Sequence, residues 1–411
     1  MMQDSITLKQ LPERRAIVFV TFSTLIMAFS SLFSLIPILI FYAIWLPHIL
    51  YGKTFVLRPS FPLVFMGLFP LICLFTLFWS DYRGETIHKG LEFASMVVCS
   101  AIVARIVPPT AFVKGLSLGV SIVMLITFLT GHSHTIGGTD EAAITGLFGS
   151  KNVVGLFATI GLFSAVSFLC TKSGKIEKIV YTALPLALCL LGLVLSRSAS
   201  SLVVAFAVIA ALIMAGIVSK FPRGLRPVIL GLLAFAAATF GFSLYAFQID
   251  LYAEILHALG KNPTLTGRTY LWEEGIRLGS SNPFLGHGYA AFWVHGQPDA
   301  ERLWKEFYID NRTGFHFHNL LIETFVETGM IGVLILASLI LITLFYALWN
   351  CVANGISIKN AIMFCIALMF AIRAFVEVDL LGPFGIGPFL FYSTYLYLFP
   401  VAVNNDTKQA Q

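Results

Sequence analysis

Residues 319–349 read NLLIETFVETGMIGVLILASLILITLFYALW, and this stretch decides the fold class. Its two charged side chains, Glu323 and Glu327, lie near its start, and no charged residue follows before position 350. A helix needs about 20 mostly apolar residues to cross the hydrocarbon core of a bilayer. The stretch therefore predicts a membrane-spanning helix.

Comparable apolar stretches follow one another along the whole chain of 411 residues. They predict an all-α polytopic membrane protein with about twelve spans. Nine spans lie in residues 1–247, three lie in residues 318–411, and the long polar loop 248–317 lies between these two parts. Only Ser30, Ser31 and their neighbours separate the first two stretches, so one long kinked helix is an alternative there. The predicted spans are 15–31, 34–50, 61–79, 89–107, 111–131, 152–171, 179–195, 201–219, 227–247, 319–349, 358–378 and 387–403.

The composition of the chain agrees with this fold class. Hydrophobic residues make up 58% and charged residues 11%, whereas soluble domains carry about 25% charged residues. This excludes a soluble multidomain enzyme and a disordered chain, and it makes membrane lipids the expected surroundings. The formal net charge of +5 is spread along an apolar chain, so no concentrated basic face is predicted that would bind nucleic acid.

The six cysteines lie in or beside apolar runs at no regular spacing. This pattern argues against a disulfide framework and against a zinc site, and it predicts small buried core residues. They are Cys73, Cys99, Cys170, Cys189, Cys351 and Cys365.

The distribution of lysine and arginine predicts the orientation. Fifteen of the 26 basic residues lie in short loops on the side of the N-terminus, and four lie in short loops on the other side. The positive-inside rule places both termini in the cytoplasm and residues 248–317 outside. The four on the outer side are Arg83, Lys89, Lys151 and Arg197.

Apolar residues at helical spacing in the loop 248–317 predict short amphipathic helices that lie over the membrane face. Glycine and proline in residues 282–289 predict the turn between two of them. The apolar sets are Leu251, Ile255 and Leu259, then Trp272 and Ile276, then Leu303 and Phe307.

Four polar clusters are predicted at the outer edge of the membrane, where burying them is costly unless they serve a function. Arg197, Arg268 and Lys151 on one face suit a diphosphate, because guanidinium groups bind phosphate oxygens with two parallel hydrogen bonds. A histidine beside them can take a proton from a hydroxyl group. The clusters are residues 146–152, 196–198, 267–272 and 316–319.

Each of these residues also has a structural interpretation. Arg197 can anchor a helix end at the lipid headgroups, and Lys151 with Asn152 can form an interfacial anchor and a helix cap. Arg268 can pair with Glu273 or Glu274 on a surface helix. His318 can be a hydrogen-bonded histidine at a helix start.

His318-Asn319, nine residues, and then Gly329-Met330-Ile331-Gly332-Val333 match the His-(Asn/Ser/Gln)-x9-Gly-x-x-Gly-(Thr/Val) pattern, so the chain resembles the bacterial O-antigen ligases. The outer-loop stretches 267–272 and 282–288 and the Ser-Arg-Ser at 196–198 resemble the same O-antigen ligase and polymerase superfamily. The resemblance implies a twelve-helix, GT-C-like enzyme of the bacterial inner membrane. It also implies that the donor is a glycan on undecaprenyl diphosphate and that the acceptor is the lipid A core, on the periplasmic face.

The same resemblance implies roles for individual residues. His318 corresponds to the essential histidine and would act as the base, and Arg197 and Arg268 correspond to the essential arginines, which would bind the diphosphate. Lys151 and Arg83 are looser matches, and Asn319 and His316 are secondary candidates. His316 is expected to be dispensable, because on a helix it would point to a different face from His318.

No cofactor is expected, and no metal, because Asp140-Glu141 and Asp299 form no Asp-x-Asp pattern. The Gly329 and Gly332 pair is expected to let another helix approach closely.

Three other functions stay open from the sequence. An O-antigen or exopolysaccharide polymerase would use the same donor with a second lipid-linked glycan as acceptor, and a protein O-oligosaccharyltransferase is a third possibility. A multi-span transporter would need ionisable groups within the membrane. Its main candidates are Arg373 and Glu377, which an i, i+4 structural pair in the eleventh span explains more simply.

Overall fold

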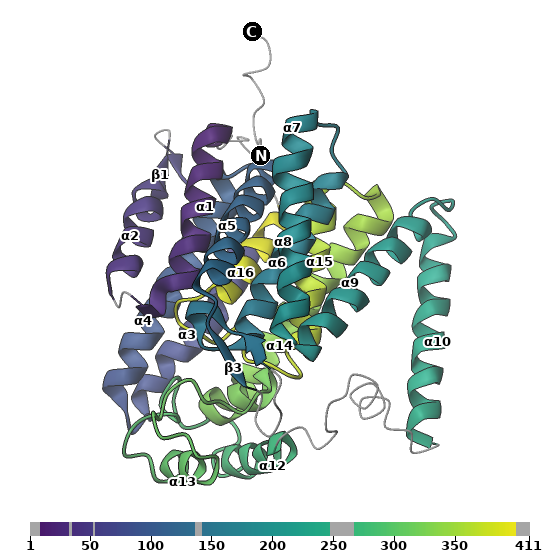
Figure 1. Cartoon of the computed structure of the whole chain (residues 1–411). Coiled ribbons are helices and arrows are strands. Elements are labelled where there is room, and N and C mark those ends of the chain that lie inside the picture. Colours follow the sequence, from purple (N-terminus) through teal and green to yellow (C-terminus); the bar gives the residue numbers. More distant parts are fainter. Residues whose placement is uncertain (1–8, 33–34, 52–53, 136–141, 247–266, 400–411) are drawn as a thin grey trace, which may run out of the picture.

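The computed structural model describes residues 9–32, 35–51, 54–135, 142–246 and 267–399 and consists almost entirely of helices (Figure 1). A helix lies at each of the twelve predicted stretches, so the prediction that these stretches are helical is confirmed. Two short antiparallel hairpins, β1–β2 (Leu50–Tyr51, Thr54–Phe55) and β3–β4 (Ser133–Thr135, Ala142–Ile144), were not predicted.

The helices along the first nine stretches are α1 to α10. Helices α1 and α2 are separate and in contact, so the single kinked helix is wrong. They are α1 Glu13–Phe29, α2 Leu35–Trp45, α3 Phe61–Phe75, α4 Arg83–Ile106, α5 Pro109–Thr130, α6 Lys151–Leu169, α7 Lys175–Lys178, α8 Leu184–Ser196, α9 Ala199–Val218 and α10 Arg226–Ala246, with a π-helical turn Ile179–Ala183 joining α7 to α8 and short 3₁₀ turns at Ser30–Leu32, Leu46–Ile49, Thr76–Phe78 and Gly146–Phe148.

The later helices are α12 Arg268–Gly279, α13 Pro298–Glu306, α14 Leu320–Asn354, α15 Ile358–Arg373 and α16 Ile386–Leu398. In the described residues, seven helical segments are long and apolar enough to cross a membrane: Phe61–Phe78, Arg83–Ile106, Pro109–Thr130, Lys151–Leu169, Lys175–Ser196, Ala199–Val218 and Leu320–Asn354. The protein is therefore polytopic. A count of twelve crossings, the GT-C likeness and the division at residues 247 and 317 stay predictions.

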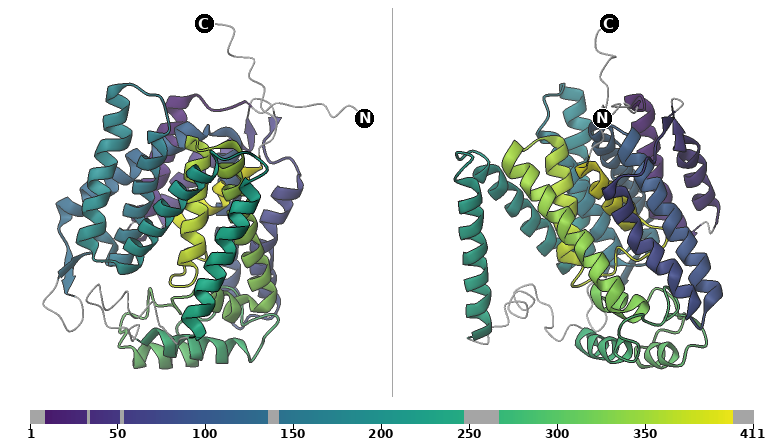
Figure 2. Two further views of the ribbon diagram at one scale, coloured as in Figure 1. Left: turned by 90° about the vertical axis from the view of Figure 1, so that its right-hand side faces the viewer. Right: turned by 180° about the vertical axis from the view of Figure 1, so that it is seen from behind.

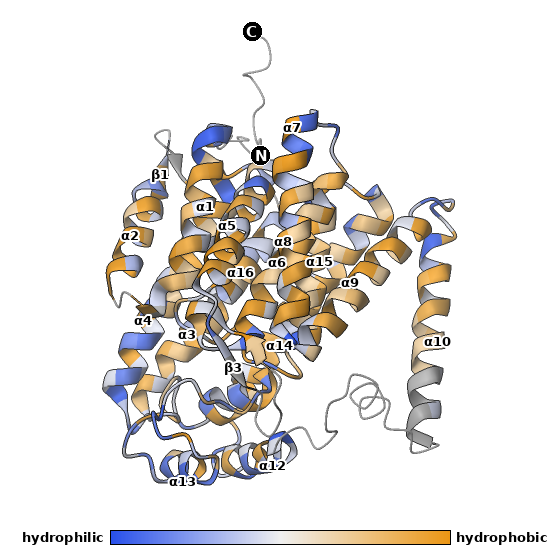
Figure 3. Cartoon of the chain, viewed as in Figure 1, coloured by the Kyte–Doolittle hydropathy of each residue, from blue (hydrophilic) through white to orange (hydrophobic). Residues whose placement is uncertain are grey.

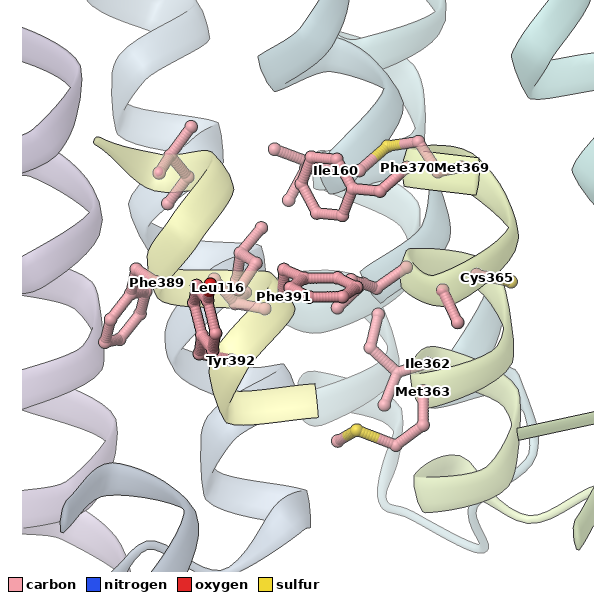
Figure 4. Packing of buried hydrophobic residues seen from close by; sticks show 14 of the residues in the cluster. Leu116, Ile160, Ile362, Met363, Cys365, Met369, Phe370, Phe389, Phe391 and Tyr392 are labelled. Atoms are coloured by element: carbon pink, nitrogen blue, oxygen red, sulfur yellow. The ribbon is translucent and has the colours of Figure 1, made fainter. Parts of the chain in front are cut away.

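Helix α16 forms the centre of the bundle, since every residue from Ile386 to Leu398 is buried. Its Phe389, Phe391 and Tyr392 lie among side chains of α5, α6 and α15 (Figure 4). The outward-facing sides of the surrounding helices are apolar (Figure 3), as lipid contact requires. Helices α12 and α13 lie across one end of the bundle, and α7 lies at the other end (Figures 1 and 2).

Helices α12 and α13 confirm two of the amphipathic helices expected in the outer loop; the one expected around Leu251 lies outside the described residues. The prediction that Trp272 and Ile276 form the buried face of α12 is wrong in part. Ile276 is exposed, whereas Leu271, Gly275 and Leu278 are buried. Gly275 has no side chain and so leaves room for Ile322 of α14 and for the ring of Phe317, which precedes α14. The buried face of α12 is therefore shifted by about one residue from the predicted one.

Gly329 interrupts helix α14, with φ 66° and ψ −170°. The backbone of Phe284 and Leu285 lies where a Cβ on Gly329 would stand, and Met330 N donates to Pro283 O at 2.8 Å. The expectation of close helix packing at Gly329 and Gly332 is therefore wrong. Gly329 packs against the backbone of the turn 282–289, and Gly332 faces Thr328 of its own helix. The glycine fixes the turn 282–289 against the start of α14.

All six cysteines lie in the described part of the chain and are free thiols there. Five are buried, as expected. Cys170 is exposed because it follows the last turn of α6, where the helix leaves the bundle.

Candidate active site

The start of α14 meets the segment that follows α15. Asn319 caps α14, because its side-chain oxygen accepts from Leu321 N at 3.0 Å and Ile322 N at 3.2 Å. Leu320 N donates to Ala374 O at 2.8 Å, and Asn319 Nδ2 donates to Phe375 O at 3.3 Å. These bonds hold the residues just before α14 against residues 374–377.

The backbone that carries His318 is held on both sides. Phe317 N donates to Glu323 Oε2 at 2.7 Å, and Phe317 O accepts from Trp272 Nε1 at 2.9 Å. The other oxygen of Glu323 accepts from Trp293 Nε1 at 2.7 Å. The buried carboxyl group of Glu323 therefore joins two parts of the segment 267–317 to the first turn of α14.

His318 itself has φ 52°, a conformation that is uncommon for residues other than glycine. Such strained positions occur often at functional sites. Its Nδ1 is buried, makes no hydrogen bond within the described residues, and lies 3.8 Å from Glu377 Oε2. The imidazole thus faces a carboxylate just beyond hydrogen-bonding distance.

Glu377 is the residue that connects the site, whereas sequence analysis named it only as the partner of Arg373 in a structural pair. Its Oε1 accepts from Asn152 Nδ2 at 2.9 Å and lies 3.5 Å from Arg268 Nη2. Burial raises the pKa of Glu377, but the His318 ring and the charges of Arg373 and Arg268 outweigh burial and lower the pKa to about 2. The carboxylate is therefore ionised at any physiological pH.

The interpretation of Arg373 and Glu377 as an i, i+4 pair is wrong. Helix α15 ends at Arg373, so Glu377 lies in the loop beyond it. The Arg373 guanidinium binds Asp379, with Nη2 to Oδ1 at 3.0 Å. The side-chain contacts of Glu377 are therefore with Asn152, Arg268 and His318.

Arg268 begins α12 and is half-buried. Its Nη1 donates to Val376 O at 2.9 Å, in addition to the contact with Glu377. The alternative pairing with Glu273 or Glu274 is wrong, since the ion pairs of Glu274 are with Arg277 and Arg302. Gly267 precedes Arg268 with φ 84°, and the Phe307 ring lies 2.6 Å from where a Cβ would stand. Only glycine fits there, so residue 267 helps to aim Arg268 at residues 376 and 377.

Arg197 ends helix α8 in the left-handed conformation, with φ 49°, and its side chain is exposed. The next residue, Ser198, donates from its hydroxyl to Asn152 Oδ1 at 3.2 Å, and Asn152 in turn binds Glu377. Asn152 is therefore not the cap of α6, which is Ser150. It links the end of α8 to the cluster around Glu377.

The two remaining candidates, Lys151 and Arg83, lie at the starts of different helices. Lys151 is the first residue of α6, next to Asn152, and is half-buried. Arg83 is the exposed first residue of α4. In the described part of the molecule no hydrogen bond joins Arg83 to Glu377 or His318.

The expected separation of His316 and His318 on two helix faces is wrong, because both residues precede α14. Their rings lie 4.1 Å apart, and His318 N donates to His316 Nδ1 at 3.1 Å. Burial lowers the pKa of His316 to about 3, and the neighbouring His318 adds to this effect. His316 is therefore neutral and carries its proton on Nε2, because Nδ1 accepts a hydrogen bond.

His316, His318 and Glu377 also form a group whose ligand atoms lie within 4.8 Å of one another, which the sequence spacing did not reveal. Such a set can hold a metal ion. Here, however, Arg268 and Arg373 already direct positive charge at Glu377, which disfavours a further cation. Metal independence stays a prediction.

Two comparisons with known proteins bear on this site. A family model described as O-antigen ligase matches residues 184–337, which include Arg197, Arg268 and His318. The exopolysaccharide production protein ExoQ of Rhizobium meliloti (strain 1021) is 37% identical over 381 residues, which cover 90% of this chain and 85% of that protein. The chain belongs to the O-antigen ligase family. Membership of this family makes the protein a glycosyltransferase-like enzyme with a polysaccharide-related function, and it does not favour a transporter.

Within an O-antigen ligase, the cluster offers complementary groups: a histidine that faces a carboxylate, an arginine beside that carboxylate, and a second arginine at the neighbouring helix end. A histidine beside a carboxylate, with fixed cations nearby, is an arrangement that suits group-transfer chemistry.

Proposed function

We propose that this enzyme transfers a glycan from undecaprenyl diphosphate to a sugar hydroxyl at the outer face of the bacterial inner membrane. The observation that carries the proposal is the meeting of His318, Glu377 and Arg268 beside the first residue of α14. The proposal assigns the base to His318 and the binding of the diphosphate to Arg268 and Arg197.

The chemistry follows from these assignments. An Nδ1–H of His318 directed at Glu377 leaves the Nε2 lone pair for the acceptor hydroxyl, as in other base and acid pairs. The hydroxyl oxygen forms a bond to the anomeric carbon of the donor sugar as Nε2 takes its proton. The bond from that carbon to the diphosphate oxygen breaks, and undecaprenyl diphosphate leaves with the electron pair. Arg268 and Arg197 stabilise the charge that develops on the diphosphate.

We propose a second lipid-linked glycan as the acceptor, which makes the protein an exopolysaccharide polymerase. The similarity to an exopolysaccharide production protein along 90% of this chain supports this choice. Transfer to lipid A core, which the His-Asn-x9-Gly-x-x-Gly pattern favoured, is the second candidate, and the family model supports it.

The acceptor can be identified with purified enzyme and a single glycan on undecaprenyl diphosphate. We expect the lipid-linked glycan to grow into a ladder of multiples without any other acceptor. Extension of added lipid A core, with no ladder, would favour the ligase instead. An inactive His318→Ala enzyme serves as the control for contaminating activity.

The proposed orientation places α12 and α13 in the periplasm and both termini in the cytoplasm. Asp299 on α13 and the exposed Cys170 after α6 lie at opposite ends of the bundle. In cells with a permeabilised outer membrane, an impermeant thiol reagent should label Asp299→Cys. Cys170 should react only after lysis. The reverse order of labelling would contradict this orientation.

We further propose that transfer needs no metal. Activity should persist in excess EDTA, because Arg268 and Arg373 supply the positive charge beside Glu377. Loss of activity that magnesium or manganese restores would instead assign His316, His318 and Glu377 to a bound ion.

A further inference from the structure

The corner between α9 and α10 holds a second candidate binding site, at the end of the bundle opposite α12 and α13. Helix α10 contacts α9 near their connecting turn and then stands apart from the other helices (Figures 1 and 2). A cavity of about 320 Å³ lies at this turn, beside the end of α14. Its lining consists of Arg223, Arg226, Trp349, Val352, Ala353 and Asn354.

The cavity is basic without nearby acidic residues. The sequence has no aspartate or glutamate in residues 199–249 or 328–376, which include both helices of the corner and the whole distal part of α14. Arg226 is fixed, since its Nη1 donates to Val352 O at 2.9 Å and Ala353 O at 2.8 Å. The exposed Arg223 has no ion pair with any described residue. Two guanidinium groups therefore face a cavity with no carboxylate to neutralise them.

An apolar stripe leads away from the cavity along α14. Trp349, Phe345 and Leu341 follow one another at i, i+4 spacing, so they share one face of the helix, and all three are exposed. On α10, Val228 and Leu232 are also four residues apart and exposed, and they form a second apolar stripe that begins two residues after Arg226. Tryptophan is typical of the membrane interface, where its ring sits at the level of the headgroups.

We propose that this corner binds one anionic phospholipid, with its phosphate at Arg223 and Arg226 and its acyl chains along the exposed stripes of α10 and α14. Basic pockets between transmembrane helices on the cytoplasmic side are suited to such headgroups. The site lies far from His318 in the fold, at the other end of α14, and it does not depend on the proposed reaction.

The experiment uses brominated lipids, which quench nearby tryptophans. The purified full-length enzyme is titrated in mixed micelles with brominated phosphatidylglycerol or brominated phosphatidylcholine. The quenching that Trp349→Phe removes is assigned to Trp349. We expect phosphatidylglycerol to be favoured, with each arginine contributing about fivefold. Arg223→Gln should reduce this preference about fivefold, and Arg223→Gln with Arg226→Gln should abolish it.

Lys178→Gln is the matched control, because Lys178 lies at the same end of the bundle on α7, outside the cavity lining. It should leave the preference unchanged. Arg223→Gln also tests the site without disturbing the bonds of Arg226 to the end of α14. Equal quenching by both lipids in the wild-type enzyme would overturn the proposal. Displacement of phosphatidylglycerol by an equal amount of undecaprenyl phosphate would also overturn it, since it would assign the corner to that lipid.

Discussion

Lys114 and Glu377 both join separate segments of the chain through charge, but their surroundings differ. Lys114 Nζ on α5 lies 2.7 Å from Glu13 Oε1 and 2.7 Å from Glu177 Oε1, and so joins α1 and α7 at one end of the bundle. Glu377, at the other end, has a neutral amide as its nearest partner, at 2.9 Å, and its contacts with Arg268 and His318 are 3.5 Å and 3.8 Å long.

This difference distinguishes the structural ion pairs of Lys114 from the candidate functional site at Glu377. Both ion pairs of Lys114 are short and their carboxylates are about half exposed, so the charges are satisfied without a ligand. Glu377 is 7% exposed, and the Arg268 guanidinium and the His318 ring stand slightly too far away for short hydrogen bonds. Catalytic hydrogen bonds are often long before substrate binds. Loose contacts around a buried carboxylate are therefore evidence for function, and the following variants test that comparison.

The largest effect is expected for His318→Ala. General-base catalysis typically contributes about 10²- to 10⁴-fold, so this variant should lose that much of its rate of glycan transfer. Folding and donor binding should persist, because the bonds at Phe317 and Asn319 hold the segment without the imidazole. His295→Ala in the same outer loop is the control and should stay active. A rate near that of the wild type for His318→Ala would remove the base from the proposed mechanism.

Arg268→Lys and Arg197→Lys should follow, with transfer reduced about 10²- to 10³-fold, since lysine keeps the charge but cannot form two parallel hydrogen bonds. Arg277→Lys, at the other end of α12, is matched to Arg268→Lys and should have little effect, because its partners are Glu274 and Asp299, which lie outside the cluster around Glu377. Steady-state rates with lipid-linked donor measure the difference. Near-normal rates in both lysine variants would make these arginines structural anchors.

Glu377→Gln should lower the rate about 10- to 100-fold, because a neutral amide no longer orients and stabilises the His318 imidazolium. Glu274→Gln, whose carboxylate also binds two arginines, is the control. If the two variants lost activity equally, the role of Glu377 would be structural.

Glu377 also predicts a pH dependence of stability. Its pKa in the folded protein is about 2, below the value of about 4.3 for an unfolded glutamate. The ionised group therefore stabilises the fold above about pH 4, and this contribution is lost as the pH falls toward 2. Thermal unfolding between pH 5 and pH 3 should be less acid-sensitive in Glu377→Gln than in the wild type. An identical pH dependence would contradict the lowered pKa.

The smallest effect on catalysis is expected for Lys114→Met. Removing a tie whose carboxylates are exposed should lower the melting temperature by no more than a few degrees and leave transfer unchanged. A large loss of activity in Lys114→Met, with the fold intact, would show that short ion pairs in this protein are also functional. The contrast drawn between Lys114 and Glu377 would then be wrong.

The sequence by itself determined where the helices lie and which outer-edge residues deserved testing. The length of an apolar run and its transfer into lipid are local properties, so the stretch 319–349 predicted α14 without knowledge of its neighbours. The spacing of His318, Gly329 and Gly332 likewise identified the family. The first acid after 49 acid-free residues, 328–376, was the signal that could have drawn attention to Glu377 as part of the site.

Only the tertiary structure decided what these residues meet. Asn152 and Glu377 are 225 positions apart, and Arg268 and Glu377 are 109 apart, so no periodicity relates them. The end of α15 at Arg373, the close fit of the turn 282–289 at Gly329 and the pairing of Arg373 with Asp379 all depend on packing between distant segments. Hydrophobic patterning selects the helices because burial from water is nondirectional. The site depends on hydrogen bonds and charges whose strength changes within an ångström, and only the packed fold sets those distances.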